Sequence, residues 1–103
     1  MYPEFAPTVT DVETVAKETI SSLHFPHQDV LHTAAERQHR MAEARRAVTL
    51  GNAYHGKLDI YFQTADGAMK RVQTTVWAAD SEYLTLKSGV SLPMRAVSWM
   101  DFY

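Results

Sequence analysis

The spacing of apolar residues near the N-terminus is helical. One apolar stripe recurs at this spacing and consists of Val12, Val15, Ala16, Ile20 and Leu23. Thr10 followed by Glu13 makes a capping box at its start. Pro26 disfavours helix at the residue before it. We therefore predict a first helix over about Asp11–Ser22, preceded by an arm that contains Pro3.

A longer helical pattern follows. The region Asp29–Leu50 is rich in alanine, which is the strongest helix former. A narrow apolar face is predicted from Leu31, Ala34, Ala35, Met41, Ala42 and Val48. Gly51 and Asn52 are typical of a helix C-terminus. We predict a second helix over about Asp29–Leu50, packed through its small alanines against a neighbouring element.

From Gly56 onward the apolar period is two, which is typical of half-buried strands. The predicted strands are Leu58–Gln63, Met69–Ala78, Tyr83–Lys87, Val90–Leu92 and Ala96–Phe102. Asp66 and Gly67 indicate a hairpin turn between the first two strands. Trp77 is out of phase with its strand, which predicts a bulge or a bend. Pro93 predicts a bulge, an edge or a corner, because proline cannot donate to a strand ladder.

These elements predict one α+β domain over residues 1–103. It comprises an arm (1–9), a helical half (10–50) and an antiparallel β half (51–103). Short connections between strands require antiparallel pairing. We expect two N-terminal helices packed on a small, strongly bent antiparallel sheet or on an Sm/SH3-like barrel.

The β half carries several short motifs. They are Gly56-Lys57 before a hairpin, Thr74-Thr75-Val76-Trp77, Leu86-Lys87-Ser88-Gly89 and a final strand with proline four residues before Val97. In these features Gly51–Phe102 resembles a group of small uncharacterised bacterial proteins, which implies no particular function. The order of elements, helix and then about five short strands, is similar to Sm-like and SH3-like barrels.

Composition limits the chemistry available to the chain. There are no cysteines, which excludes disulfides, thiol nucleophiles and zinc–thiolate sites. Small secreted domains often depend on disulfides, so we expect a reducing, cytoplasmic location. Neither a signal peptide nor a membrane span is expected, because no apolar run is long enough.

Charge and aromatic residues supply the candidate binding residues. The formal net charge is −2, whereas nucleic-acid binders usually carry an excess of positive charge. The basic cluster consists of Arg37, Arg40, Arg45 and Arg46. Arg37 and Arg40, together with Tyr61 and Trp77 of the β half, are the candidate ligand-binding residues. Aromatic side chains on a small barrel can stack bases or sugars; the alternative is that they pack against the helices.

A row of possible metal ligands lies on the second predicted helix. His32, Glu36, His39 and Glu43 follow one another at one-turn spacing. His32, Glu36 and His39 are the candidate metal ligands, since zinc, iron or nickel accepts imidazole and carboxylate. A di-iron site needs a second such motif on a facing helix, and the sequence has one. A solvated helix face is the favoured interpretation, and no cofactor is predicted.

Function is not encoded in any motif of this sequence. It contains neither a nucleophile elbow nor a phosphate-binding loop. We expect a non-catalytic interaction module that self-associates or binds a protein partner, with the apolar tail Trp99–Tyr103 offering a strand for edge addition. The alternatives are an Sm-like nucleic-acid-binding protein and a metal-binding protein.

Overall fold

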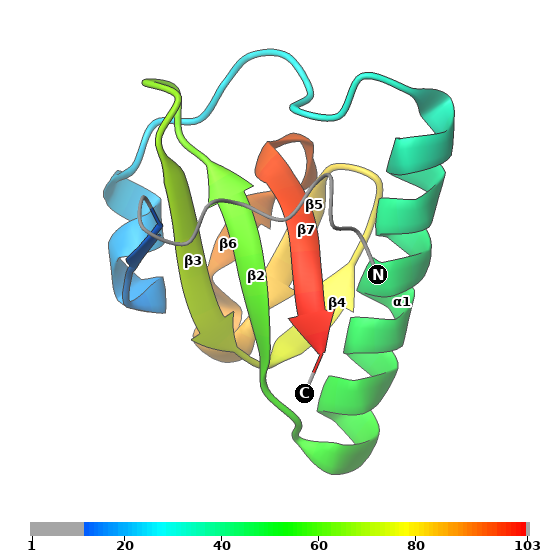
Figure 1. Ribbon diagram of the computed structural model, residues 1–103. Coiled ribbons are helices and arrows are strands. Elements are labelled where there is room, and N and C mark those ends of the chain that lie inside the picture. The colour runs from blue at the N-terminus through cyan, green and yellow to red at the C-terminus, as the bar shows by residue number, and fades with distance from the viewer. Residues whose placement is uncertain (1–11, 103) are drawn as a thin grey trace.

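A computed structural model describes residues 12–102. It contains one long helix and two small sheets that face each other (Figure 1). In the first sheet the strand order is β1-β3-β2-β7, and in the second it is β4-β5-β6. The α+β class of the sequence prediction is confirmed. In place of the one antiparallel sheet that was predicted there are two sheets, and the first is mixed because Glu13–Thr14 pairs in parallel with its neighbour. The two sheets do not close into a barrel, so the barrel form of the prediction is wrong.

The helix α1 spans Ala34–Tyr54, a few residues later than the predicted Asp29–Leu50. It begins at Thr33 because a capping box forms there: the Thr33 hydroxyl accepts from the Glu36 amide at 3.1 Å, and the Glu36 carboxylate accepts from the Thr33 amide at 3.2 Å. It continues through Gly51 and ends at His55, which adopts the left-handed conformation (φ 53°) common at helix C-termini.

The predicted first helix is not present, and the expectation of two N-terminal helices is wrong. Within Asp11–Ser22 the described residues form the two-residue strand β1 (Glu13–Thr14) and a 3₁₀ helix (Lys17–Ser22). β1 pairs in parallel with β3, and the Val15 amide donates to the Arg71 carbonyl at 2.8 Å. A free edge of the sheet therefore outweighs the local helical pattern in this segment.

The capping residue proposed for that helix, Thr10, lies outside the described residues, as does the N-terminal arm. In Figure 1 the blue N-terminal segment lies beside β3, on the side of the sheet away from α1. The neighbouring elements on which α1 packs are strands of the two sheets.

The first sheet contains the longest strands, β2 (Leu58–Gln63), β3 (Met69–Thr74) and β7 (Val97–Phe102). The predicted hairpin turn joins β2 to β3, with Gly67 at φ 87° and its amide donating to the Thr64 carbonyl at 2.9 Å. β7 pairs with the other edge of β2 and lies at the edge of the sheet.

The second sheet contains β4 (Val76–Ala79), β5 (Tyr83–Leu86) and β6 (Ser91–Pro93). The single predicted strand Met69–Ala78 is bent at Thr75 and supplies β3 to one sheet and β4 to the other. The predicted bulge at Trp77 is confirmed by the register shift in the β4–β5 pair. Pro93 is a corner: β6 ends there, and a 3₁₀ turn (Met94–Ala96) leads into β7.

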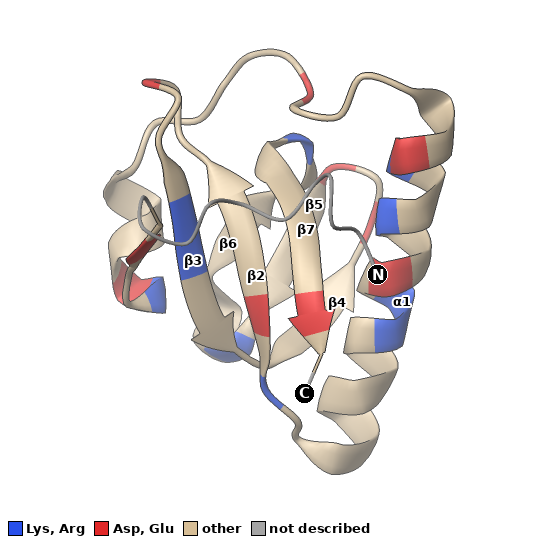
Figure 2. Cartoon of the chain, in the orientation of Figure 1, with Lys and Arg blue, Asp and Glu red and all other residues tan. Residues whose placement is uncertain are grey.

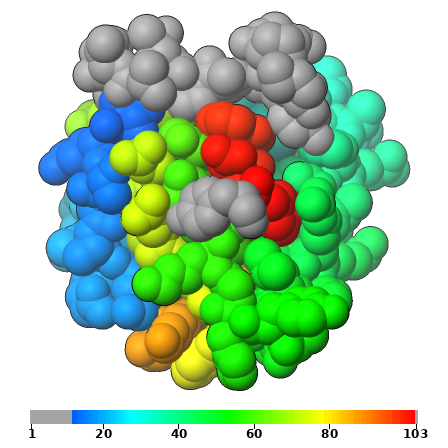
Figure 3. Space-filling view, turned by 60° about the horizontal axis from the view of Figure 1, so that its bottom comes forward, coloured from blue at the N-terminus to red at the C-terminus, as the bar shows by residue number. Residues whose placement is uncertain are grey.

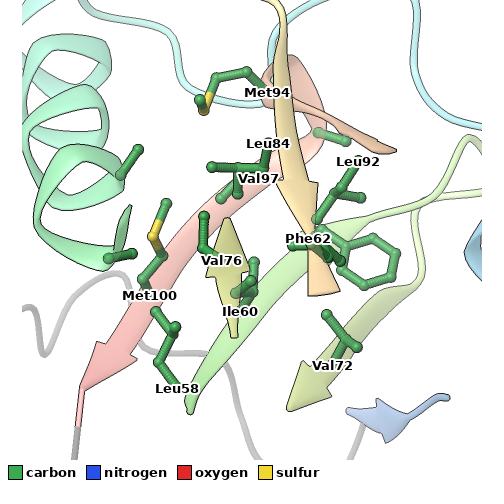
Figure 4. Close-up of a cluster of buried hydrophobic side chains, with 14 of the residues drawn as sticks. Leu58, Ile60, Phe62, Val72, Val76, Leu84, Leu92, Met94, Val97 and Met100 are labelled. Atoms are coloured by element: carbon green, nitrogen blue, oxygen red, sulfur yellow. The ribbon is translucent and has the colours of Figure 1, made fainter. Parts of the chain in front are cut away.

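The core lies between the two sheets and under α1, and it includes large side chains from every main strand (Figure 4). The largest fully buried residues are Phe62, Ile20, Leu58, Ile60, Leu84, Leu86, Leu92 and Met94. α1 closes the core through Ala44, Ala47 and Gly51, with Met41 and Val48 partly buried.

The face of α1 that packs on the core is therefore not the apolar face predicted from the sequence. Ala34, Ala35 and Ala42 are exposed, because the small residues that approach β4 lie further along the helix. A Cβ atom at Gly51 would lie 2.2 Å from the Val76 carbonyl oxygen, so the helix backbone contacts the strand directly there. No helix within residues 12–102 is long and apolar enough to cross a bilayer.

A candidate ligand groove between the helix and the last strand

A groove of about 220 Å³ lies between the first half of α1 and the strand β7. It is open to solvent and its walls are mostly apolar. The lining residues come from the loop before α1, from α1 itself and from β7: Leu31, Ala35, Glu36, His39, Arg40, Glu43, Ser98, Trp99 and Met100. The groove does not continue along the whole helix, because the Arg46 guanidinium of α1 lies 4.2 Å from the centre of the Phe102 ring at the end of β7. Figure 3 shows the red end of β7 against the green surface of α1.

Arg40 forms the base of this groove and joins three parts of the chain. Its side chain is 7% exposed. Its two terminal nitrogens donate to the two carboxylate oxygens of Asp29 at 2.8 and 2.6 Å, and one of them also donates to the Val97 carbonyl at 2.9 Å. The loop before α1, the helix and the start of β7 are thereby held together by one buried, two-pronged ion pair.

The electrostatics of the pair favour the charged form of Asp29. Burial by itself raises the pKa of Asp29, but hydrogen bonds from Arg40 and from the Leu31 amide, together with the Arg40 charge, outweigh it and hold the pKa below its ordinary value. The buried arginine is therefore compensated at neutral pH.

One donor of Arg40 remains unused. Its Nε is, within residues 12–102, the one buried side-chain nitrogen or oxygen for which no hydrogen-bond partner is found. A buried donor without an acceptor costs free energy.

Two carboxylates lie on the helix side of the groove, those of Glu36 and Glu43. The amide of Thr33, and then its hydroxyl and the amide of His32, lower the pKa of Glu36. Glu43 lies 3.6 Å from Arg46, whose side chain is 64% exposed. Figure 2 shows these acidic positions among the basic ones of α1, and an acidic position on the neighbouring strand β7.

The three predicted metal ligands do not form one group in the structure. His32 precedes the helix and Glu36 serves the N-terminal capping box, where its carboxylate accepts from the His32 and Thr33 amides at 3.2 Å. His39 lines the groove. No group of three His, Asp or Glu side chains among the described residues is placed to hold a metal ion.

The predicted ligand-binding residues are not gathered at one place. Arg40 lies in the groove, whereas Arg37 is exposed and donates to the Leu31 carbonyl at 2.9 Å. Tyr61, on β2, is 4% exposed and stacks on Trp99 with ring centroids 4.4 Å apart. Trp77 lies on β4 in the other sheet and is 46% exposed.

Sequence reasoning did not identify Asp29 or the groove-lining residues Leu31, Ser98 and Met100 as site residues. Asp29 has no sequence signal, because its partner is a helix residue eleven positions later whose burial depends on the sheet. Trp99 was noticed only as part of the apolar tail. Residues 99–102 of the tail lie at a sheet edge: one side of β7 pairs with β2, and the other carries no strand among residues 12–102 and faces the groove.

The chain matches no protein-family model, no curated protein and no solved structure. The function of the groove therefore has to be derived from its own geometry and charge.

Proposed function

We propose that this protein is a non-catalytic interaction module that recognises a segment of a partner protein in the groove between α1 and β7. The observation that carries the proposal is the apolar groove beside a sheet edge that has no strand partner among the described residues. Unpaired strand edges are sites of association with other chains.

The size of the groove favours a peptide segment over other ligands. At about 220 Å³ it is smaller than the roughly 300–1,000 Å³ typical of small-molecule sites. A docked helix, about 10–12 Å wide, needs a broader surface. One or two side chains of an extended segment fit the space, while the backbone of the segment lies along the strand.

The same edge bears on the predicted self-association. Addition of another copy to the C-terminal strand has to use the side of β7 that faces α1, because β2 occupies the other side. Self-association through the tail and binding of a partner segment are therefore mutually exclusive in this proposal.

The proposal is tested with a phage-displayed library of random linear peptides and three forms of the full chain. Ala35 is exposed and lines the groove, so Ala35→Trp fills the site with little cost to folding. Ala42→Trp places the same side chain on an exposed part of the same helix, outside the groove, and is the matched control.

We expect peptides that are retained by the wild type and by Ala42→Trp but not by Ala35→Trp. Failure to enrich any peptide, or equal retention by Ala35→Trp, overturns the proposal. Circular dichroism of both variants verifies that the helix is intact.

The alternative of an Sm-like nucleic-acid-binding protein is supported by the order of the strands alone, and fold analogy does not specify function. Arg40, one of its candidate contacts, is already neutralised by Asp29. Retention of single-stranded RNA at low salt, lost as salt rises, would favour this alternative over the peptide groove.

A further inference from the structure

We infer that the segment bound in the groove is an extended, basic–apolar stretch of a different protein that adds to the edge of β7. This inference rests on the proposed function and specifies the chemistry of the partner. It depends on the main-chain edge, the apolar walls and the charges around them.

The main-chain edge favours an extended partner. The carbonyl of Val97 on the groove side already accepts from a side chain, Arg40, at 2.9 Å. From Ser98 to Met100, which line the groove, β7 carries no strand on that side among the described residues.

The walls select an apolar side chain. Leu31 and Ala35 lie on one side, and Trp99 and Met100 on the other. Side chains of a strand alternate between two faces. A segment that buries one apolar residue between these walls therefore turns its neighbouring residues toward the rims of the groove.

Those rims are acidic. Glu36 and Glu43 line the groove on the helix; Asp101, which does not line it, is an exposed residue of the same strand. The one buried cation of the groove, Arg40, is balanced by Asp29, and Arg46 reaches Glu43 only at 3.6 Å from an exposed position. Lysine or arginine on the partner is the charge complement of this arrangement.

A second copy of this chain does not provide that complement. The other described edge strands are β1, β4 and β6, and none of them contains lysine or arginine. Pro93 in β6 also lacks an amide donor. Residues 1–11, which lie outside the described part, contain no lysine or arginine either. The charges therefore favour a different protein as the partner.

The test uses two phage-displayed peptide libraries. In one library alternate positions are restricted to lysine and arginine, and in the other the same positions are restricted to aspartate and glutamate. Groove-dependent clones are those retained by the wild type and by Ala42→Trp but not by Ala35→Trp. We expect such clones from the basic library and none from the acidic one.

The strongest clone is then synthesised with a fluorescent label, and its affinity is measured by anisotropy. The double variant Glu36→Gln/Glu43→Gln is expected to bind it about tenfold more weakly; glutamine retains the capping function of position 36. A copy of the peptide that is N-methylated at alternate residues is expected to lose binding by a similar factor, because it cannot pair fully with a strand edge.

The outcomes distinguish failure of this inference from failure of the proposed function. Groove-dependent clones that arise equally from both libraries, or that tolerate N-methylation, overturn the inference and leave the proposed function standing. Absence of groove-dependent clones from both libraries overturns the proposed function itself.

Two further measurements test the competing occupants. Concentration-dependent dimerisation in sedimentation velocity that is abolished by Ala35→Trp identifies a second copy as the occupant. A synthetic peptide of residues 1–11 that competes more strongly than the basic clone identifies the chain's own segment. Either result overturns the assignment of a different protein.

Discussion

Asp29 and Arg40 form a two-pronged ion pair, with oxygen–nitrogen distances of 2.8 and 2.6 Å, and Arg40 lines the groove between α1 and β7. Arg40 is 7% exposed and also donates to the Val97 carbonyl. This pair ties the loop before the helix to the edge strand. The two residues of the pair are eleven positions apart, and no local pattern connects them.

The first prediction concerns the stability contributed by this pair. Asp29→Asn removes the charge that compensates a buried guanidinium, and we expect the free energy of unfolding to fall by about 3 kcal/mol. Urea unfolding followed by circular dichroism measures the change. The control is Glu43→Gln, which disrupts the longer, 3.6 Å pair with Arg46, whose side chain is 64% exposed, and is expected to cost about 0.5 kcal/mol or less. Equal effects of the two variants would contradict the assigned role of Asp29.

The second prediction concerns acid sensitivity. The pKa of Asp29 is lower in the folded chain than in the unfolded chain. Its stabilising contribution is therefore complete above the unfolded pKa of about 3.9 and is lost as the pH falls through the lower folded value. The difference in unfolding free energy between the wild type and Asp29→Asn is expected to narrow across this pH range. A difference that stays constant as the pH falls would show that stability does not depend on the protonation of Asp29.

The third prediction concerns the contact between α1 and β4. In an exposed helix interior, alanine in place of glycine is favourable by roughly 0.5–1 kcal/mol. Gly51→Ala is nevertheless expected to destabilise the protein by about 2 kcal/mol or more, because the new Cβ has no space. It would lie 2.2 Å from the Val76 carbonyl oxygen and 2.8 Å from a methyl carbon of Thr75. Thermal unfolding is the measurement. Asn52→Ala, at the exposed next position, is the control and is expected to change stability little; a stabilising Gly51→Ala would disprove the close contact.

The fourth prediction concerns the end of α1. His55 adopts φ 53° and ψ 31°, a conformation that costs a side-chain-bearing residue about 1–2 kcal/mol. His55→Gly is expected to raise the free energy of unfolding by about 0.5 kcal/mol, since the relief of strain exceeds the entropy that glycine loses on folding. Ala53→Gly, in the last turn of the helix, is the control and is expected to lower it by about 1 kcal/mol. Destabilisation by both variants would argue against a left-handed cap at His55.

Local signals in the sequence account for much of the β half. The alternation through Leu58, Ile60 and Phe62 predicts a strand with these three residues inward, and all three are fully buried. Asp66 and Gly67 predict the turn that follows, and Pro93 predicts the corner before the last strand. These features were predictable because each depends on residues close together in the chain.

The start of α1 also depends on residues close together in the chain. Thr33 and Glu36 form a capping box that is visible in the sequence, although the expected helix began at Asp29.

The N-terminal segment and the groove were decided only by the tertiary structure. Glu13–Thr14 form a strand because the edge of β3, 57 residues away, offers backbone partners, and the helical spacing of the apolar residues there is overridden. Arg40 belonged to a helix that the sequence predicted, but its burial depends on Asp29 and on Val97, 57 residues further along the chain. The sequence by itself determined where the chain makes turns, strands and one long helix, because capping, period and turn chemistry are local. The packing of α1 on β4 and β7, and with it the groove, was decided by contacts between distant segments, which no local spacing encodes.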